Sequence, residues 1–259
     1  MRISLLTIFP DFFPPVLAEG MIRAAREKGR LDVDIVNLRD HTDDSHRTTD
    51  DYPFGGGVGM IMKIEPVARA IRFLGVGEKC ARPAGTRVLL TSPQGRRFTQ
   101  AVALEYASLG HIVIVCGRYK GVDERVFETL VDEEFSIGDF ILSGGEPAAL
   151  CVVDAVARLQ PEVVGRFDSV ESDSFHSGVL DAAYYTRPAE FEGHKVPDVL
   201  LSGNHALIAR HRREESLRRT FERRPELLEG VELDEADRKF LRRLRAAAEA
   251  KAGDSGAGS

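Results

Sequence analysis

Residues His111–Val126 read HIVIVCGRYKGVDERV, and residues Glu133–Pro147 read EEFSIGDFILSGGEP. The first stretch begins with β-branched residues, which are typical of a buried parallel strand, and then enters a turn bounded by glycines. The second is a glycine-rich segment that follows another strand-like run. Glycines allow backbone N–H and C=O groups to approach a ligand closely, because no Cβ stands in the way. The two segments therefore predict the walls of one pocket for a flat small molecule, and with it an enzyme that uses a cofactor.

Strands and helices alternate around this stretch. We expect strands at 3–9, 31–37, 87–91 and 112–116, and helices at 12–28, 65–73, 99–109, 123–129 and 145–159. A polar loop is expected at 41–60. Strands that alternate with helices predict an α/β fold with a parallel sheet.

The character of the sequence changes after Pro161. Residues 162–195 hold few periodic segments and many Asp, Ser, Gly and Tyr, so we interpret them as an interdomain linker with functional content. Residues 196–250 predict a smaller all-helical domain, and the tail at 251–259 is expected to be disordered. The helix after Asn204 is rich in arginine: Arg210, Arg212, Arg213, Arg218, Arg219, Arg223 and Arg224. Such a concentration in a chain of net charge −6 suits the binding of phosphates.

Composition restricts the class of protein further. The three cysteines, Cys80, Cys116 and Cys151, are far apart and odd in number, which argues against a disulfide framework or a zinc site and favours the reducing cytoplasm. Cys116 ends an apolar run, and we interpret it as a small core residue. No apolar run approaches the ~20 residues that span a bilayer, so no membrane association is expected.

Three turns follow strand-like runs: SPQG at 92–95, GRYKG at 117–121 and IGDFILSGGEP at 137–147. In open α/β sheets, ligands gather at the carboxyl ends of the strands, so three such turns in sequence favour a binding site. None of them matches a GxGxxG dinucleotide fingerprint or a GxxxxGK[ST] phosphate loop. Phosphate is therefore not the expected ligand of the pocket.

Longer motifs carry a resemblance to a known family. They are HRTTDDYPFGGGVGM at 46–60, SPQGRRFTQ at 92–100, CGRYKGVDERV at 116–126, SIGDFILSGGEPA at 136–148, SDSF at 172–175, YTRP at 185–188, LLSGNHALIARHR at 200–212 and RTFERRPELL at 219–228. Their order and spacing resemble those of the bacterial tRNA (guanine-N1)-methyltransferases, of the knotted methyltransferase class, over residues 1–245. The resemblance implies a deep trefoil knot in a domain at 1–161 that binds S-adenosylmethionine. It also implies a homodimer with active sites at the subunit interface, and methylation of N1 of guanine 37, just 3′ of the anticodon in tRNA, with no role for DNA.

The same resemblance assigns roles to single residues. Asp173 is implied as the general base and Arg158 as its electrostatic partner. The residues implied to bind the cofactor are Leu89, Leu90, Ser92, Pro93, Gly117, Arg118, Tyr119, Gly121, Ile137, Gly138, Asp139, Phe140, Ile141, Leu142, Gly144, Gly145 and Pro147. Contacts with RNA are expected from His46, Arg47, Asp50, Arg212, Arg218 and Arg219. No metal ligand is assigned, and the use of Mg²⁺ is left open.

The chemistry of the reaction fits the pair of Asp173 and Arg158. N1 of guanine carries a proton, which must leave before N1 can attack the sulfonium methyl group. A free aspartate, with a pKa of about 3.9, is a weak base for this proton. An arginine aimed at O6 would stabilise the negative charge that develops as the proton leaves, and its permanently charged fork suits that role. The target base is expected to leave its stack to reach the pocket.

Two positions depart from the family pattern. Lys120 stands where the family has glutamate, which reverses a charge near the cofactor, and Val58 stands where the glycine loop usually has proline. The first change leaves open an RNA-binding protein that keeps the cofactor pocket without catalysis. A related knotted methyltransferase acting on another RNA is a further alternative. The presence of both Asp173 and Arg158 favours catalysis.

Overall fold

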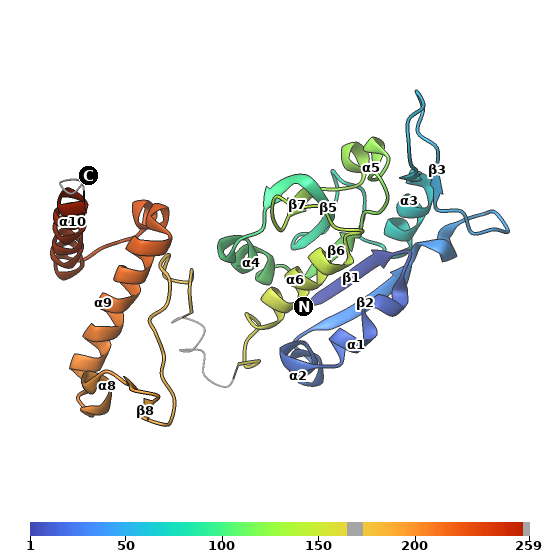
Figure 1. Ribbon diagram of the computed structural model, residues 1–259. Coiled ribbons are helices and arrows are strands. Elements are labelled where there is room, and N and C mark those ends of the chain that lie inside the picture. The colour runs from blue at the N-terminus through green and yellow to red at the C-terminus, as the bar shows by residue number, and fades with distance from the viewer. Residues whose placement is uncertain (165–172, 256–259) are drawn as a thin grey trace. The chain divides into compact units, whose positions relative to one another are not determined.

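The computed structural model describes residues 1–164 and 173–255. The chain divides into two compact units, residues 1–166 (unit 1) and 167–259 (unit 2), and each is described by itself. Unit 1 combines a sheet with helices, and unit 2 consists mainly of helices (Figure 1).

Unit 1 is built on a five-stranded sheet in which every neighbouring pair of strands is parallel. The strand order is β2-β1-β6-β5-β7. The strands are β1 (Arg2–Thr7), β2 (Asp32–Asn37), β5 (Thr86–Arg97), β6 (His111–Val115) and β7 (Glu133–Ser136). The expected α/β fold with a parallel sheet is thereby confirmed.

Helices cover both faces of this sheet (Figure 1). The helices are α1 (Pro14–Leu17), α2 (Gly20–Glu27), α3 (Ile64–Phe73), α4 (Gln100–Ala107), α5 (Glu124–Thr129) and α6 (Glu146–Ala157). On β6, Ile112 and Ile114 pack in one core with α2, α4 and α6, whereas Val113 and Val115 pack in the other core with α3 and α5. All four side chains are buried because successive residues of a strand point to opposite faces. Burial of each contributes about 1.5–3 kcal/mol, which explains the continuous apolar run.

The expected helix at 12–28 is wrong. The segment forms a 3-10 turn, η1 (Pro10–Phe12), and then two separate helices, α1 and α2. Proline occupies the first turn of α1, where its missing N–H costs no hydrogen bond, and Gly20 has a left-handed φ of 58° that ends the helical path. Phe13, Leu17 and Ile22 all remain in one core, so the apolar spacing alone gave no sign of the break.

Short elements precede, interrupt and follow the polar loop expected at 41–60. A 3-10 turn, η2 (Leu38–His41), precedes it, and β3 (Asp50–Asp51) pairs antiparallel with β4 (Ile61–Met62). This hairpin joins the ends of the glycine-rich loop. The register pairs Asp50 with Met62, which fixes the position of Asp50 relative to β4 in this separate two-stranded sheet.

Unit 2 packs around the long helix α9. Its elements are β8 (Glu190–Phe191), β9 (His194–Lys195), α8 (Asp198–Leu201), α9 (His205–Arg223), η3 (Pro225–Gly230) and α10 (Glu235–Ser255). Leu217 of α9 is fully buried against Phe240 and Leu241 of α10 and against Val179. The expected disordered tail at 251–259 overlaps the end of α10, and its residues 256–259 lie outside the described residues. Residues 165–172 of the expected linker also lie outside them.

Within the described ranges, no helix combines the length and the apolar character that a membrane span requires.

Candidate active site

The SPQG turn at 92–95, which lies within β5, and the turns that follow β6 and β7 surround one cavity of about 690 Å³ in unit 1. A volume of this size accommodates a nucleoside-sized cofactor. The predicted cofactor residues that line it are Leu90, Ser92, Pro93, Gly117, Arg118, Tyr119, Gly121, Ile137, Gly138, Phe140, Ile141, Leu142, Gly144 and Gly145. Leu89 is instead buried in the core, Asp139 forms an exposed ion pair with Arg97, and Pro147 lies in the first turn of α6. None of these three lines the cavity.

Two hydrogen bonds join the three turns to one another. The backbone N–H of Gly117 donates to Oγ1 of Thr91 at 2.9 Å, and the N–H of Gly145 donates to the carbonyl oxygen of Gly117 at 2.8 Å. A Cβ at Gly145 would overlap the Thr91 hydroxyl, so only glycine allows this approach. β5 bulges out of the sheet after Thr91, which places SPQG at the cavity.

A buried ion pair connects the second turn to the third. The carboxylate of Glu146, at the start of α6, is completely buried and lies 2.8 Å from Nη2 of Arg118. It also accepts hydrogen bonds from Nε of Arg118 at 3.1 Å and from the hydroxyl of Thr7 at 2.7 Å. The guanidinium of Arg118 stacks on Phe9, with its carbon 4.3 Å from the ring centroid. Arg118 therefore has a structural role in the wall of the cavity.

Sequence reasoning did not single out Glu146 or Thr91. The one available signal was that Glu146 is the only acidic residue in SGGEPAAL, a segment that is otherwise uncharged. The interpretation of Cys116 as a core residue is confirmed, because its side chain is fully buried beside this ion pair. Burial raises the pKa of the Cys116 thiol well above its usual value, and the charge of Glu146 adds to this effect.

The loop at 50–62 lies against the second turn of the cavity. The N–H of Met62 donates to the carbonyl of Gly121 at 3.0 Å, and the N–H of Lys120 donates to the carbonyl of Met60 at 3.1 Å. Burial raises the pKa of Tyr119, and the nearby carboxylate of Asp50 raises it further. The structure thus brings Asp50, predicted to contact RNA, next to a cavity residue.

His46 and Arg47 are exposed in the segment just before this loop. Nη2 of Arg47 lies 2.6 Å from a carboxylate oxygen of Asp40, and the N–H of His46 donates to Asp44 at 3.0 Å. Neither residue lines the cavity. Their contact with RNA stays a prediction.

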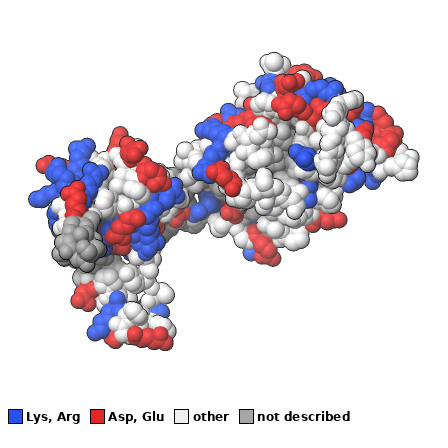
Figure 2. Space-filling view, turned by 45° about the horizontal axis from the view of Figure 1, so that its top comes forward, with Lys and Arg blue, Asp and Glu red and all other residues white. Residues whose placement is uncertain are grey.

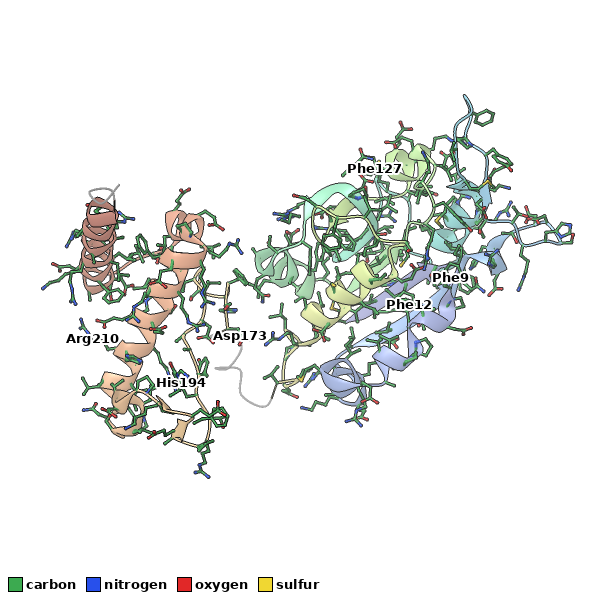
Figure 3. All side chains as sticks on the ribbon, in the orientation of Figure 1. Phe9, Phe12, Phe127, Asp173, His194 and Arg210 are labelled. Carbon is green, nitrogen blue, oxygen red and sulfur yellow. The ribbon has the colours of Figure 1, made fainter. Side chains whose placement is uncertain are left out.

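The two predicted catalytic residues belong to different units. Arg158 caps the carboxyl end of α6 in unit 1, where its N–H donates to the carbonyl of Asp154 at 3.2 Å. Asp173 opens the described part of unit 2 (Figure 3). Its carbonyl accepts a hydrogen bond from the N–H of His176 at 3.2 Å. Their pairing therefore stays a prediction.

The arginines of α9 are partly neutralised by acidic neighbours. Arg218 and Arg219 both pair with Glu215, at 2.6 and 3.4 Å, and Arg213 pairs with Asp237 of α10 at 2.6 Å. Figure 2 accordingly shows basic and acidic side chains interspersed on unit 2. In residues 1–164 and 173–255, no group of three or more His, Cys, Asp or Glu side chains is arranged to hold a metal ion.

Comparison with known proteins agrees with the resemblance seen in the motifs. The chain is 50% identical over 244 residues to a tRNA (guanine-N(1)-)-methyltransferase of Geobacter metallireducens, covering 94% of this chain and 98% of that protein. Proteins of the same name from Geobacillus kaustophilus and Moorella thermoacetica are 48% and 49% identical, covering 93% and 94% of this chain and 97% and 96% of theirs. The family model described as tRNA (Guanine-1)-methyltransferase TrmD matches residues 1–230. With nearly its whole length matched, the chain belongs to this family of tRNA methyltransferases.

Proposed function

We propose that this protein transfers a methyl group from S-adenosylmethionine to N1 of guanine 37 in tRNA. The observation that carries the proposal is the cavity in unit 1, which three turns of the family's motifs surround. Family membership supports the class of reaction, and the cavity supports a nucleoside-containing methyl donor.

The residues of the cavity fit such a donor. Its walls carry apolar side chains for an adenine ring, such as Ile137 and Leu142, beside glycine backbone that can hydrogen-bond to the ring's edge. Glu124 and Glu134 also line it, and their carboxylates favour a ligand with a positive charge, whereas the carboxylate of Asp123 is paired with Arg125. When bound, the donor supplies an electrophilic methyl group on a sulfonium.

Asp173 and Arg158 would prepare the guanine. In the proposed reaction the Asp173 carboxylate takes the N1 proton, and Arg158 stabilises the charge that moves to O6. N1 then forms a bond to the methyl carbon, and the electron pair of the carbon–sulfur bond returns to sulfur. Methyl transfer of this kind needs no metal in principle, because the leaving group is already activated.

The finer structural features implied by the family are part of the proposal. We propose that the chain passes through a trefoil knot at the three turns, which is supported by the close approach of Gly145 to Gly117. We also propose a homodimer with active sites at the interface. The exposed side chains of Phe140, Ile141 and Leu142, beside the cavity, support it, because such patches commonly mark contacts with a partner. Residues 196–250 are proposed to form a tRNA-binding domain, and the cytoplasm is the proposed place of action.

Lys120 is proposed to weaken any stimulation by Mg²⁺. Its side chain is exposed and lies against Gly59, so it adds a positive charge at the edge of the cavity. Methylation should therefore depend more strongly on Mg²⁺ in Lys120→Glu than in the wild type. Equal dependence of the two proteins would count against this role.

Labelled methyl transfer tests the proposal directly. The donor is S-adenosylmethionine carrying a labelled methyl group, and the acceptors are two tRNA transcripts that differ only in guanine or adenosine at position 37. We expect label on the guanine transcript alone, mapped to N1, and a loss of turnover in Asp173→Ala with cofactor binding retained. Cofactor binding without label on either transcript would favour a non-catalytic RNA-binding protein. Unchanged turnover in Asp173→Ala would remove Asp173 from its role.

A further inference from the structure

Unit 2 contains a second hollow, of about 550 Å³, which the proposed chemistry does not use. The half-buried side chains of Val196 and Leu200 give it an apolar lining. Tyr185, Arg187 and Arg212 are exposed around it. The hollow thus combines an apolar lining with an aromatic ring and cationic side chains.

Arg212 is held in an arrangement that suits stacking. Its guanidinium carbon lies 5.2 Å from the ring centroid of Tyr184, another residue of the hollow. Arg210 and Arg213, its neighbours on α9, pair with Glu214 and Asp237. In the described part of the chain, no ion pair involves Arg212. Its positive charge is therefore directed at the hollow without an acidic partner to neutralise it.

These features match one class of ligand. Nucleobases stack on tyrosine and on the guanidinium plane of arginine, and arginine also binds phosphate with two parallel hydrogen bonds. We propose that the hollow binds one unpaired nucleotide of the substrate RNA. Its base would lie against Tyr185, and its phosphate beside Arg187 and Arg212. The inference rests on the proposed function for the identity of the RNA.

The hollow is connected to the segment that carries Asp173. The hydroxyl of Tyr184 donates to a carboxylate oxygen of Asp181 at 3.2 Å, and the N–H of Asp181 donates to the hydroxyl of Ser174 at 2.9 Å. Ser174 is the direct neighbour of Asp173. A nucleotide bound in the hollow would restrain Tyr184 and, through this chain, the position of the proposed base.

Fluorescent tRNA transcripts test the proposal. Each transcript carries 2-aminopurine at one unpaired anticodon-loop position other than the target guanine, and binding is measured without methyl donor. At one position we expect a fluorescence change that Tyr185→Phe retains and Tyr185→Leu abolishes. The Kd for tRNA should rise about tenfold in Tyr185→Leu, as the loss of one base–aromatic stack predicts. Arg212→Ala should also weaken binding. Phe191→Leu is the matched control, because Phe191 is exposed in unit 2 outside the hollow.

Two results would overturn the inference. The first is wild-type affinity and an unchanged fluorescence signal in Tyr185→Leu. The second is altered sedimentation of RNA-free Tyr185→Leu with tRNA affinity unchanged, which would make the hollow a protein contact. Because binding is measured without donor, Tyr185-dependent binding without methylation would support the hollow and refute the proposed function. Methylation that does not depend on Tyr185 or Arg212 would support the proposed function and refute the role of the hollow.

Discussion

Replacing Thr220 by valine is expected to slow methyl transfer while leaving cofactor affinity unchanged. Thr220 is fully buried on α9, and its hydroxyl accepts a hydrogen bond from the N–H of Leu180 at 3.0 Å. Ser216, one turn earlier, donates to the carbonyl of the same residue. The two hydroxyls therefore hold Leu180 by both of its backbone groups.

This attachment extends to Asp173 through the loop itself. The N–H of Phe175 donates to the carbonyl of Val179 at 2.8 Å, which closes the loop just before Leu180. The N–H of Asp181 donates to Ser174 at 2.9 Å on the other side of Leu180. A loop closed in this way moves as one piece, so holding Leu180 also holds Asp173.

The magnitude follows from the hydrogen bond that valine cannot accept. An unsatisfied, partly buried N–H costs about 1–2 kcal/mol. The ratio of the closed loop, in which Leu180 is held on α9, to an open loop, in which it is released, should fall by about 5- to 30-fold. The rate of methyl transfer should fall by at most this factor, and by less where the closed loop is in large excess. Thr220→Ser keeps the hydroxyl and should keep the rate.

Single-turnover methylation, calorimetric binding of S-adenosylmethionine and hydrogen exchange at Leu180 together test this reasoning. We expect faster exchange at Leu180 and a slower rate in Thr220→Val, with the affinity for the cofactor unchanged. Faster exchange with a wild-type rate would refute the argument, because it would show that the loop can open without affecting the proposed base. A rate lost equally in Thr220→Ser would point to packing rather than to the hydroxyl.

Three further predictions concern other parts of the molecule. Glu146→Gln leaves the largely buried charge of Arg118 without its counter-ion, at a cost of about 3 kcal/mol. Calorimetry should therefore show a Tm lower by about 6–12 °C. An unchanged Tm would contradict the structural role of the ion pair. Arg218→Ala combined with Arg219→Ala should weaken tRNA binding. The slope of the logarithm of the tRNA-binding constant against the logarithm of salt concentration should fall in magnitude by less than about 1.8, because both arginines already share Glu215. An unchanged slope would exclude contact of these arginines with phosphates. Burial, and then the charge of Arg2, lowers the pKa of His111 in the folded state, so His111 contributes stability above pH ~6.5 that is lost as the pH falls from there through the lowered pKa. Urea unfolding should therefore show a smaller loss of stability over this pH range in His111→Asn, and an equal loss would assign the effect to other groups.

Short sequence patterns predicted the parts of unit 1 whose conformation depends on neighbouring residues in the chain. The strand at 112–116 could be predicted because Ile112, Val113, Ile114 and Val115 are all apolar and β-branched, and both faces of β6 are buried. The binding turns could be predicted because their glycines permit close approach of backbone. The helix at 12–28 could not be placed correctly, since its apolar spacing continues across the break at Gly20.

Contacts between distant segments were beyond such patterns. Glu146 is bonded to Thr7 and Arg118, which are far from it along the chain, and nothing local to SGGEP specifies those partners. The same holds for Thr220, whose partner Leu180 lies in a segment without periodic pattern. In each case a buried polar group must find a partner, because an unpaired one costs about 1–3 kcal/mol, but the sequence does not state which. Sequence reasoning therefore misses the residues that hold a site in position without contacting its ligand. The loop carrying Asp173 depends on two such residues, Ser216 and Thr220.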